Sequence, residues 1–263
     1  MKDLKDRYGE WALVTGASAG IGEAFAHHLA RSGMSLILVA RRKERLDNLA
    51  SDLVRRHPVQ ALPLPLDLTA PDFLERLVQG VGGREVGMLV NNAGFGSAGR
   101  FVEQDVRREA DMVLLNCWAG TAIAHQFIPG MIARRRGAVI WVSSVAGYQP
   151  MPFMTTYAAT KAFDLSMGEA LWYELRPCGI DALALSPGTT ATEFQAVARM
   201  SVGPIVATAE EVVATAMRAL GRKPSVVAGR INRILAFGHR VMPRRVSLAL
   251  AGRIVGRLHT RGR

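Results

Sequence analysis

The stretch Thr15-Gly-Ala-Ser-Ala-Gly-Ile-Gly22 decides the fold, because it joins the end of a strand to a glycine-rich turn and the start of a helix. The apolar residues 11–15 predict a short buried strand, and residues 20–31 predict the helix that follows it. The three glycines let backbone segments approach closely, and a helix N-terminus attracts phosphate. This context favours a dinucleotide-binding turn over a glycine-rich turn without a ligand.

The alternation of strand and helix continues along the chain. Strands are predicted at residues 35–40, 61–67, 88–91, 138–143, 180–186 and 225–228, and helices at 43–56, 71–80, 104–135, 155–176 and 209–220. Pro63 and Pro65 suit an edge strand, whereas Pro129 and Gly130 predict a break in the helix at residues 104–135. The pattern predicts a single doubly wound, parallel α/β sheet of about seven strands with helices on both faces. Such sheets bind ligands at the C-terminal ends of their strands.

Length and composition fit one catalytic domain followed by an extension. The chain has 263 residues, and we assign residues 1–228 to a dinucleotide-binding catalytic domain and 229–263 to a basic, amphipathic, helical extension. Two cysteines are too few for a disulfide framework, and no cysteine or histidine spacing indicates a metal. Residues 1–10 lack the apolar stretch of a secretory signal. We therefore expect a cytoplasmic protein, with peripheral contact to the inner face of a membrane as an option.

The extension carries the whole charge excess of the chain. Residues 221–263 contain eleven basic residues and no acidic one, whereas the rest carries 22 of each sign. A helix here would place apolar residues on one face (Val246, Leu250, Ala251, Ile254, Val255 and Leu258) and arginines opposite (Arg245, Arg253 and Arg257). This pattern is typical of a helix on an anionic membrane surface. A lid over the substrate, a subunit contact, and an acidic partner such as an acyl carrier protein or coenzyme A phosphates are alternatives. Nucleic acid is not expected, because no groove-reading motif is present.

The end of the second predicted strand discriminates between nicotinamide cofactors. A carboxylate there usually holds the ribose hydroxyls of NAD, whereas arginine suits the 2′-phosphate of NADP. Arg41 and Arg42 follow the strand, where no acid is present, and Arg41 could pair with a 2′-phosphate. The alternative is that the two arginines begin a solvated helix. Ser18 could add a hydroxyl donor. The sequence favours NADP(H), with NAD(H) as the alternative.

Tyr157 and Lys161 are the candidates for proton transfer. They lie four residues apart on one predicted helix, and so on the same face. A nearby ammonium favours the phenolate and so lowers the pKa of the tyrosine hydroxyl toward the range that is useful for acid–base catalysis. Ser144 could donate a hydrogen bond to a carbonyl, and Asn116 could hold a water that links Lys161 to solvent. The Tyr–Lys spacing alone is common by chance, so its weight comes from the neighbouring motifs.

Taken together and in this order, the motifs resemble the short-chain dehydrogenase/reductase family: Thr15–Gly22, Asn91–Gly94, Asn116, Ser144, Tyr157 with Lys161, and Pro187-Gly188. The resemblance covers about the first 230 residues and implies a Rossmann fold with a seven-stranded sheet. It also implies a catalytic tetrad of Asn116, Ser144, Tyr157 and Lys161. Ser144 is preferred to Ser143 because it lies thirteen residues before Tyr157, the usual spacing in the family.

The resemblance further implies that Lys161 binds the nicotinamide ribose and that Pro187-Gly188 with a following threonine contacts the carboxamide. Thr192 is favoured for that threonine, with Thr189 or Thr190 as competitors. The predicted cofactor-binding residues are Gly16, Ser18, Gly20, Ile21, Gly22, Arg41, Arg42, Asp67, Leu68, Asn92, Ala93, Gly94, Tyr157, Lys161, Pro187, Gly188, Thr190 and Thr192. The predicted substrate residues are Ser144, Met151, Phe153, Tyr157 and Phe194.

The expected function is an NADP(H)-dependent oxidoreductase that interconverts a carbonyl and a secondary alcohol, with tyrosine as the acid or base. Met and aromatic residues near the predicted site favour an apolar substrate: a lipid-like ketone, a 3-oxoacyl chain or a steroid-like carbonyl. The alternative is a catalytically silent NAD(P) sensor or scaffold on the same fold. Members of this family are commonly oligomers, so a homo-oligomer is expected.

Overall fold

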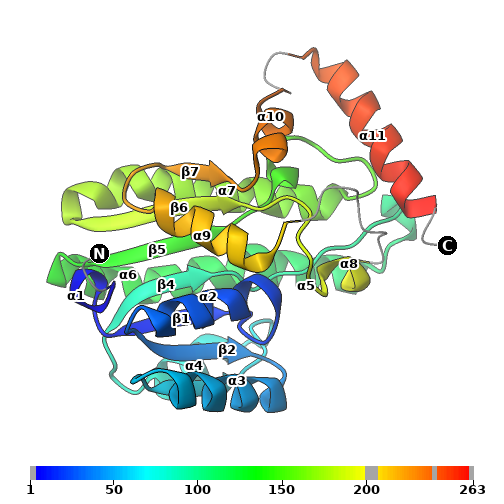
Figure 1. Ribbon diagram of the computed structural model, residues 1–263. Coiled ribbons are helices and arrows are strands. Elements are labelled where there is room, and N and C mark those ends of the chain that lie inside the picture. Colours follow the sequence, from blue (N-terminus) through cyan, green and yellow to red (C-terminus); the bar gives the residue numbers. More distant parts are fainter. Residues whose placement is uncertain (1–3, 199–206, 239–241, 261–263) are drawn as a thin grey trace.

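A seven-stranded parallel sheet forms the centre of the computed structural model, which describes residues 4–198, 207–238 and 242–260 (Figure 1). The strand order is β3-β2-β1-β4-β5-β6-β7. The strands are β1 (Trp11–Thr15), β2 (Ser35–Ala40), β3 (Ala61–Pro65), β4 (Val86–Asn91), β5 (Gly137–Val142), β6 (Ile180–Ser186) and β7 (Ser225–Val227). Strands β1, β2, β4 and β5 are buried almost throughout, as expected for a sheet covered on both faces. The predicted fold class is confirmed.

Helices cover the sheet in two layers. Buried residues of α2 (Gly20–Arg31), α3 (Lys43–Arg56) and α9 (Ala209–Ala219) pack on one face. Residues of α4 (Phe73–Val81), α6 (Gly120–Arg134) and α7 (Thr155–Leu175) pack on the other. The remaining helices are α1 (Leu4–Tyr8), α5 (Val106–Val113), α8 (Phe194–Val197), α10 (Arg230–Gly238) and α11 (Arg244–Thr260).

The region predicted as one broken helix differs from expectation. The predicted break at Pro129 and Gly130 is wrong, because α6 continues through both residues. Pro129 and His125 are exposed, so water can serve the carbonyl that loses its backbone partner. The irregularity lies earlier, where residues Leu114–Ala119 form a π-helix between α5 and α6.

The C-terminal extension forms two helices that pack on the body of the molecule. Ser247 of α11 donates a hydrogen bond to Gln149 at 2.7 Å, and Val255 joins the apolar cluster that contains Tyr157. Asn232 of α10 lies so close to Gly188 that a Cβ there would come within 2.1 Å of the amide. The domain boundary at residue 229 stays a prediction. Among the helices that the structure describes, none is long and apolar enough to cross a membrane.

Candidate active site

The candidate site lies at the C-terminal ends of the parallel strands. A cavity of about 1050 Å³ opens there, between the turn after β1, the ends of β2 and β4, and α8. Nine of the predicted cofactor residues line it: Gly16, Ser18, Arg41, Arg42, Asp67, Leu68, Ala93, Gly94 and Thr192. The other nine do not: Gly20, Ile21, Gly22, Asn92, Tyr157, Lys161, Pro187, Gly188 and Thr190.

The glycine-rich turn forms a cradle without side chains beside this cavity. Gly16 has φ +66°, a conformation that favours glycine. A Cβ on Gly22 would lie 2.3 Å from the carbonyl oxygen of Gly16, so no side chain fits where α2 begins. No side chain caps the N-terminus of α2. Its backbone N–H groups and positive dipole end therefore remain for an anion, and the turn fits a dinucleotide pyrophosphate.

Arg42 is the arginine that meets Ser18. Its guanidinium donates to Ser18 Oγ at 3.0 and 3.1 Å and to Glu193 at 2.7 Å. Arg45 also pairs with Glu193, at 2.5 Å. Arg41, which was predicted to pair with a 2′-phosphate, lines the same cavity and helps to lower the pKa of Asp67. The cavity thus has a cationic rim at the end of β2.

Two predicted cofactor residues turn their side chains to the protein. Asp67 accepts hydrogen bonds from the backbone N–H and the hydroxyl of Thr69, at 3.0 and 2.7 Å. These bonds lower the pKa of Asp67, against the effect of its partial burial. Asn92 donates to the carbonyl of Thr15 at 2.9 Å, so its amide joins the end of β4 to the turn after β1.

Tyr157 and Lys161 lie together on α7, and both are buried, with 7% and 5% of their surfaces exposed. The Ser144 hydroxyl, at the end of β5, is near enough to lower the pKa of Tyr157. Ser143 is instead tied to the backbone, since its hydroxyl donates to the carbonyl of Lys161 at 2.6 Å. The geometry therefore favours Ser144 over Ser143 as the residue that faces the tyrosine.

Burial dominates the electrostatics of Tyr157. It raises the pKa of the phenol, while the ammonium of Lys161 and the hydroxyl of Ser144 lower it. The net direction is upward, so the phenol is the favoured form near neutral pH. A tyrosine in this state is equipped to donate a proton.

Lys161 has a buried partner that the sequence analysis missed. Its ammonium donates to the Val142 carbonyl at 2.9 Å and to Asp164 at 2.8 Å. Asp164 also accepts a hydrogen bond from Trp141 Nε1 at 2.7 Å. The signal was present in the sequence, because a residue three positions after Lys161 shares its helix face.

Asn116 lies in the π-helix, a distortion that is frequent at functional sites. Its amide donates to Thr160 at 2.9 Å and to the carbonyl of Phe95 at 3.0 Å, and its oxygen accepts from the Phe95 N–H at 3.1 Å. The side chain is therefore fixed next to the helix that carries Lys161, and a direct bond to Lys161 is not formed.

An aromatic side chain covers the tyrosine. The ring of Phe194, on α8, lies 5.2 Å from the ring of Tyr157, centroid to centroid. Met151 and Phe153 pack against the same apolar cluster, and Phe153 also contacts α11 near Gly256. Of the five predicted substrate residues, Phe194 alone lines the open cavity within the described part of the chain.

Comparisons with known proteins agree with this geometry. The family model described as short chain dehydrogenase matches residues 10–202. The chain is 32% identical to a 7beta-hydroxysteroid dehydrogenase of Clostridium sardiniense over 96% of this chain and 98% of that protein. A solved structure from work on 7beta-hydroxysteroid dehydrogenase stereoselectivity superposes with a TM-score of 0.88 at 30% identity, covering 95% of this chain and 99% of that one. The structure of a short-chain dehydrogenase from Sphingobium yanoikuyae in complex with NADPH superposes with a TM-score of 0.76 at 36% identity. This match covers 83% of this chain and 87% of that one.

The chain belongs to the short-chain dehydrogenase/reductase family. It is therefore an NAD(P)-dependent oxidoreductase that acts on CH–OH groups, and the predicted family and enzyme class are confirmed. The roles of the individual site residues stay predictions, which the following proposals use.

We predict that Gly22→Ala abolishes cofactor binding, because its Cβ would meet the Gly16 carbonyl at 2.3 Å and force the turn open. Titration of the protein with NADPH, followed by nucleotide fluorescence, measures this, with circular dichroism to check folding. Gly238→Ala is the matched control, since a Cβ there meets no atom of the described residues within 4 Å. Tight NADPH binding by a folded Gly22→Ala variant would contradict the assignment of the turn.

Proposed function

We propose that the protein reduces a bulky, apolar ketone with NADPH and that Tyr157 is the proton donor. The observation that carries the proposal is the buried Tyr157–Lys161 pair, with Ser144 beside it, next to a cavity lined by a glycine-rich cradle. The similarity to a 7beta-hydroxysteroid dehydrogenase over nearly the whole chain supports a steroid-like carbonyl, and the similarity to very-long-chain 3-oxoacyl-CoA reductases supports a 3-oxoacyl chain as the alternative.

The preference for NADPH rests on the rim of the cavity. Arg42 and Ser18 converge at 3.0 Å beside the turn, and the residues directly after β2 are Arg41 and Arg42 rather than an acid. Guanidinium and hydroxyl donors suit a 2′-phosphate. Glu193 pairs with Arg42 in this structure, so the phosphate would compete with that carboxylate for the guanidinium. A similar protein whose structure contains NADPH supports the same choice.

The chemistry divides between cofactor and protein. Bound NADPH supplies the hydride. The glycine-rich turn would hold the pyrophosphate of the cofactor, and Arg42 would hold its 2′-phosphate. Lys161 has a third N–H, beyond its two bonds in the protein, that would serve a ribose hydroxyl. Ser144 donates a hydrogen bond to the carbonyl oxygen of the substrate, and the Tyr157 phenol delivers its proton to that oxygen.

The ring of Phe194, which lies against the ring of Tyr157, bears on how a substrate would enter. Phe194 lies on the tyrosine ring, and Arg108 fixes the end of α8 by a hydrogen bond to the Val197 carbonyl at 3.0 Å. We propose that a ketone reaches the phenol when Phe194 moves aside, after which the ring of Phe194 offers an apolar wall. This favours an apolar substrate large enough to replace the aromatic contact.

We predict that Tyr157→Phe retains NADPH binding within about twofold but loses turnover by about 10²–10⁴-fold, because the acid is removed and the fold is not. The measurement is NADPH oxidation against ketosteroids, a chain-length series of 3-oxoacyl thioesters, and aldehydes. Tyr173→Phe, on the exposed side of the same helix, is the control. The catalytically silent alternative predicts no turnover in the native protein with any of these substrates.

We predict that Arg42→Ala raises the KM for NADPH by about 10–100-fold and leaves the KM for NADH unchanged, because a charged hydrogen bond contributes about 1.5–3 kcal/mol. Arg56→Ala is the matched control, an exposed arginine on α3 that pairs with Asp52. Steady-state kinetics with both cofactors separates the cases. An equal loss for NADPH and NADH would remove Arg42 as the determinant of the preference.

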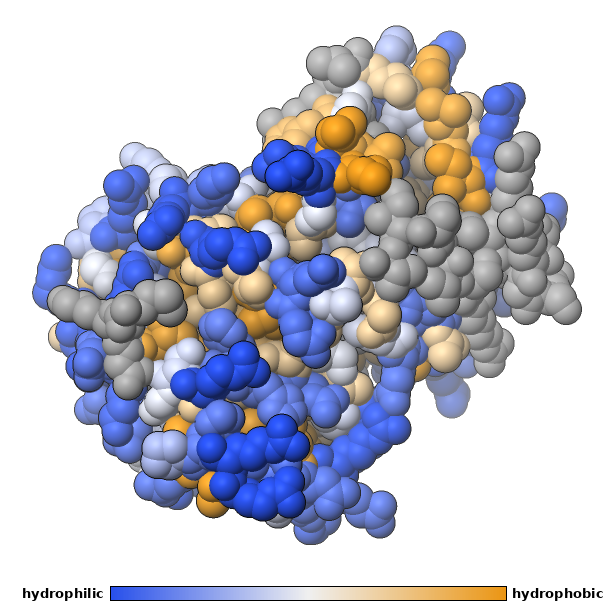
Figure 2. Space-filling model, in the orientation of Figure 1, coloured by the Kyte–Doolittle hydropathy of each residue, from blue (hydrophilic) through white to orange (hydrophobic). Residues whose placement is uncertain are grey.

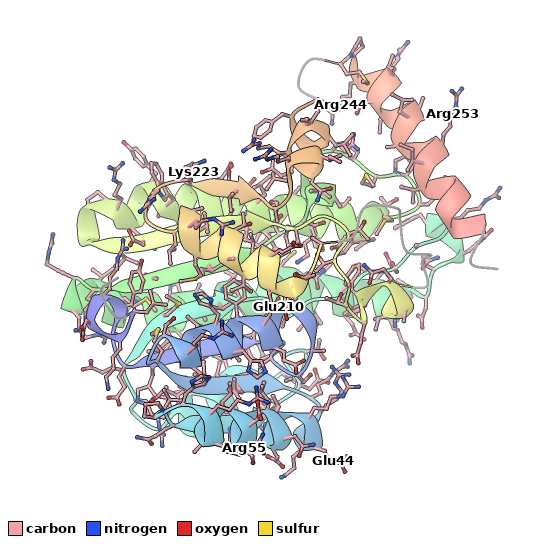
Figure 3. The ribbon with its side chains drawn as sticks, viewed as in Figure 1. Glu44, Arg55, Glu210, Lys223, Arg244 and Arg253 are labelled. Atoms are coloured by element: carbon pink, nitrogen blue, oxygen red, sulfur yellow. The ribbon has the colours of Figure 1, made fainter. Side chains whose placement is uncertain are left out.

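We also propose that α10 and α11 contact an anionic membrane surface. Apolar side chains are exposed on both helices, and Figure 2 shows hydrophobic side chains over α10 and along α11 on one face of the molecule. They include Ile231, Ile234, Leu235, Phe237, Val246, Leu250 and Ile254. Exposed arginines accompany them: Arg230, Arg233, Arg244, Arg245 and Arg253. Arg253 points away from the body (Figure 3).

The packing of α11 refines the expected helix face. Ala251 and Val255, which were expected to share the outward apolar stripe, are buried against the body, at 4% and 2% exposed. The apolar stripe that α11 exposes is therefore narrower than expected, and exposed apolar side chains of α10 extend it. The side chains of Leu258 and Arg257 lie outside the described residues.

We predict that the double variant Arg244→Glu/Arg253→Glu binds vesicles that contain phosphatidylglycerol at least about 30-fold more weakly than the native protein, since each basic residue contributes about 1 kcal/mol. Co-sedimentation measures the binding, and vesicles of neutral phosphatidylcholine show the electrostatic share. Arg222→Glu/Lys223→Glu makes the same charge change far from α11 (Figure 3). Binding to a soluble acyl carrier protein but to neither vesicle would favour that alternative.

The expected homo-oligomer stays a prediction. Exposed apolar side chains on the π-helix and α7 support it, among them Trp118 at 55% and Phe163 at 38% exposed.

A further inference from the structure

A buried carboxylate that the proposed chemistry does not use lies directly behind the reacting pair. Asp164 follows Lys161 by one turn of α7, and its side chain is 2% exposed. Its two oxygens accept hydrogen bonds from Lys161 Nζ and from Trp141 Nε1. We propose that Asp164 is a positioning residue that fixes the charge of the Tyr157–Lys161 pair and so sets the pH range in which the enzyme works.

Stability alone gives a weak reason for an acid at this place. Replacing a buried ion pair with apolar residues of similar volume is often neutral or stabilising, because desolvation offsets the Coulomb gain. Asp164 borders a small cavity that the apolar side chains of Leu115, Ile123 and Trp141 also line. What the carboxylate adds is a negative charge 2.8 Å from the ammonium.

The surroundings make Asp164 the main counter-charge of Lys161. Among the described residues, the groups that act on Lys161 are Asp164, Tyr157 and, from the π-helix, Cys117. Burial raises the pKa of the Cys117 thiol to about 11, so this group is neutral near pH 7. Burial also raises the pKa of Asp164, and the bonds from Lys161 and Trp141 oppose that rise.

The charge count gives the direction of the effect. With Asp164 ionised, the buried group of Asp164, Lys161 and Tyr157 is neutral, and loss of the next proton leaves a net negative charge. Without the carboxylate, the pair of Lys161 and Tyr157 starts at +1 and loses a proton to become neutral. Burial disfavours net charge, so the pair loses its proton at lower pH when Asp164 is absent. This holds whether the proton leaves the phenol or the ammonium.

The consequence concerns the two directions of the reaction and rests on the proposed function. Reduction needs the phenol form of Tyr157, whereas alcohol oxidation needs the phenolate. Asp164 keeps the pair protonated to higher pH. It therefore extends reduction into the alkaline range and restricts oxidation at neutral pH.

The test compares pH profiles of the native enzyme and Asp164→Asn. For reduction, kcat/KM falls at alkaline pH, and in Asp164→Asn this fall should occur about 1–3 pH units lower than in the native enzyme. For oxidation, kcat/KM rises at alkaline pH, and this rise should move to lower pH in the same way. Glu174→Gln removes one exposed negative charge from the same helix and should leave both profiles in place. Trp141→Phe removes the other hydrogen bond of Asp164 but keeps its charge, so its profile should move much less than that of Asp164→Asn.

A second measurement does not depend on turnover. The ultraviolet difference absorbance between each protein and its Tyr157→Phe counterpart follows ionisation of this tyrosine directly, and Asp164→Asn should shift its midpoint to lower pH. Asp164→Glu, which restores the charge, should return the midpoint toward the native value. A native midpoint in Asp164→Asn, or a lower kcat with unmoved profiles, would overturn the proposal. If the native protein has no turnover but the midpoint shifts, the proposed function fails and the role of Asp164 stands.

Discussion

The hydroxyl of Thr15 holds together the two strand ends between which the cavity opens. It donates to the Val90 carbonyl at 3.3 Å and accepts the backbone N–H groups of Asn92 and Ala93, each at 2.9 Å. One side chain at the end of β1 thus fixes the start of the glycine-rich turn against the end of β4. The Asn92 amide returns a bond to the Thr15 carbonyl, so the contact is reciprocal. The cradle, the cationic rim and the reacting pair are all arranged around this junction.

Most of the fold could be predicted because its signals are local. Uninterrupted apolar runs with turn residues at their ends give buried parallel strands, and the predicted bounds of β1, β2, β6, α2 and α3 agree with the structure. Pro63 and Pro65 indicated an edge, and β3 is an edge strand. The helix break predicted at Pro129 was wrong, because water can bond to the free carbonyl when a proline lies on the exposed side of a helix. The π-helix at Leu114–Ala119 was not predicted, and the partners of Asn116 within it come from segments distant in sequence, Phe95 and Thr160.

The candidate site could be predicted only as far as spacing carries information. The tyrosine, the lysine and the glycine-rich turn follow from positions along one helix or one turn. The choice between Arg41 and Arg42 depends on where a strand end points in space, and the two serines differ only in their partners. The helical spacing that pairs Tyr157 with Lys161 also places Asp164, three residues after the lysine, on the same helix face. An acid three residues after the lysine reads as an ordinary polar residue until its burial against Trp141 is known.

The C-terminal extension touches the catalytic body at two places: Asn232 supports the turn at Gly188, and Val255 packs in the cluster of Tyr157. The same two helices present the apolar and arginine-rich outer surface. Under the proposed membrane contact, occupation of that surface and the seating of α11 against the body would be coupled. Coupling between two binding events is reciprocal. If the membrane binds the protein more tightly when α11 is packed on the body, then membrane binding must also favour the packed position of α11. A bilayer in that position would act as an effector of the enzyme as well as its location.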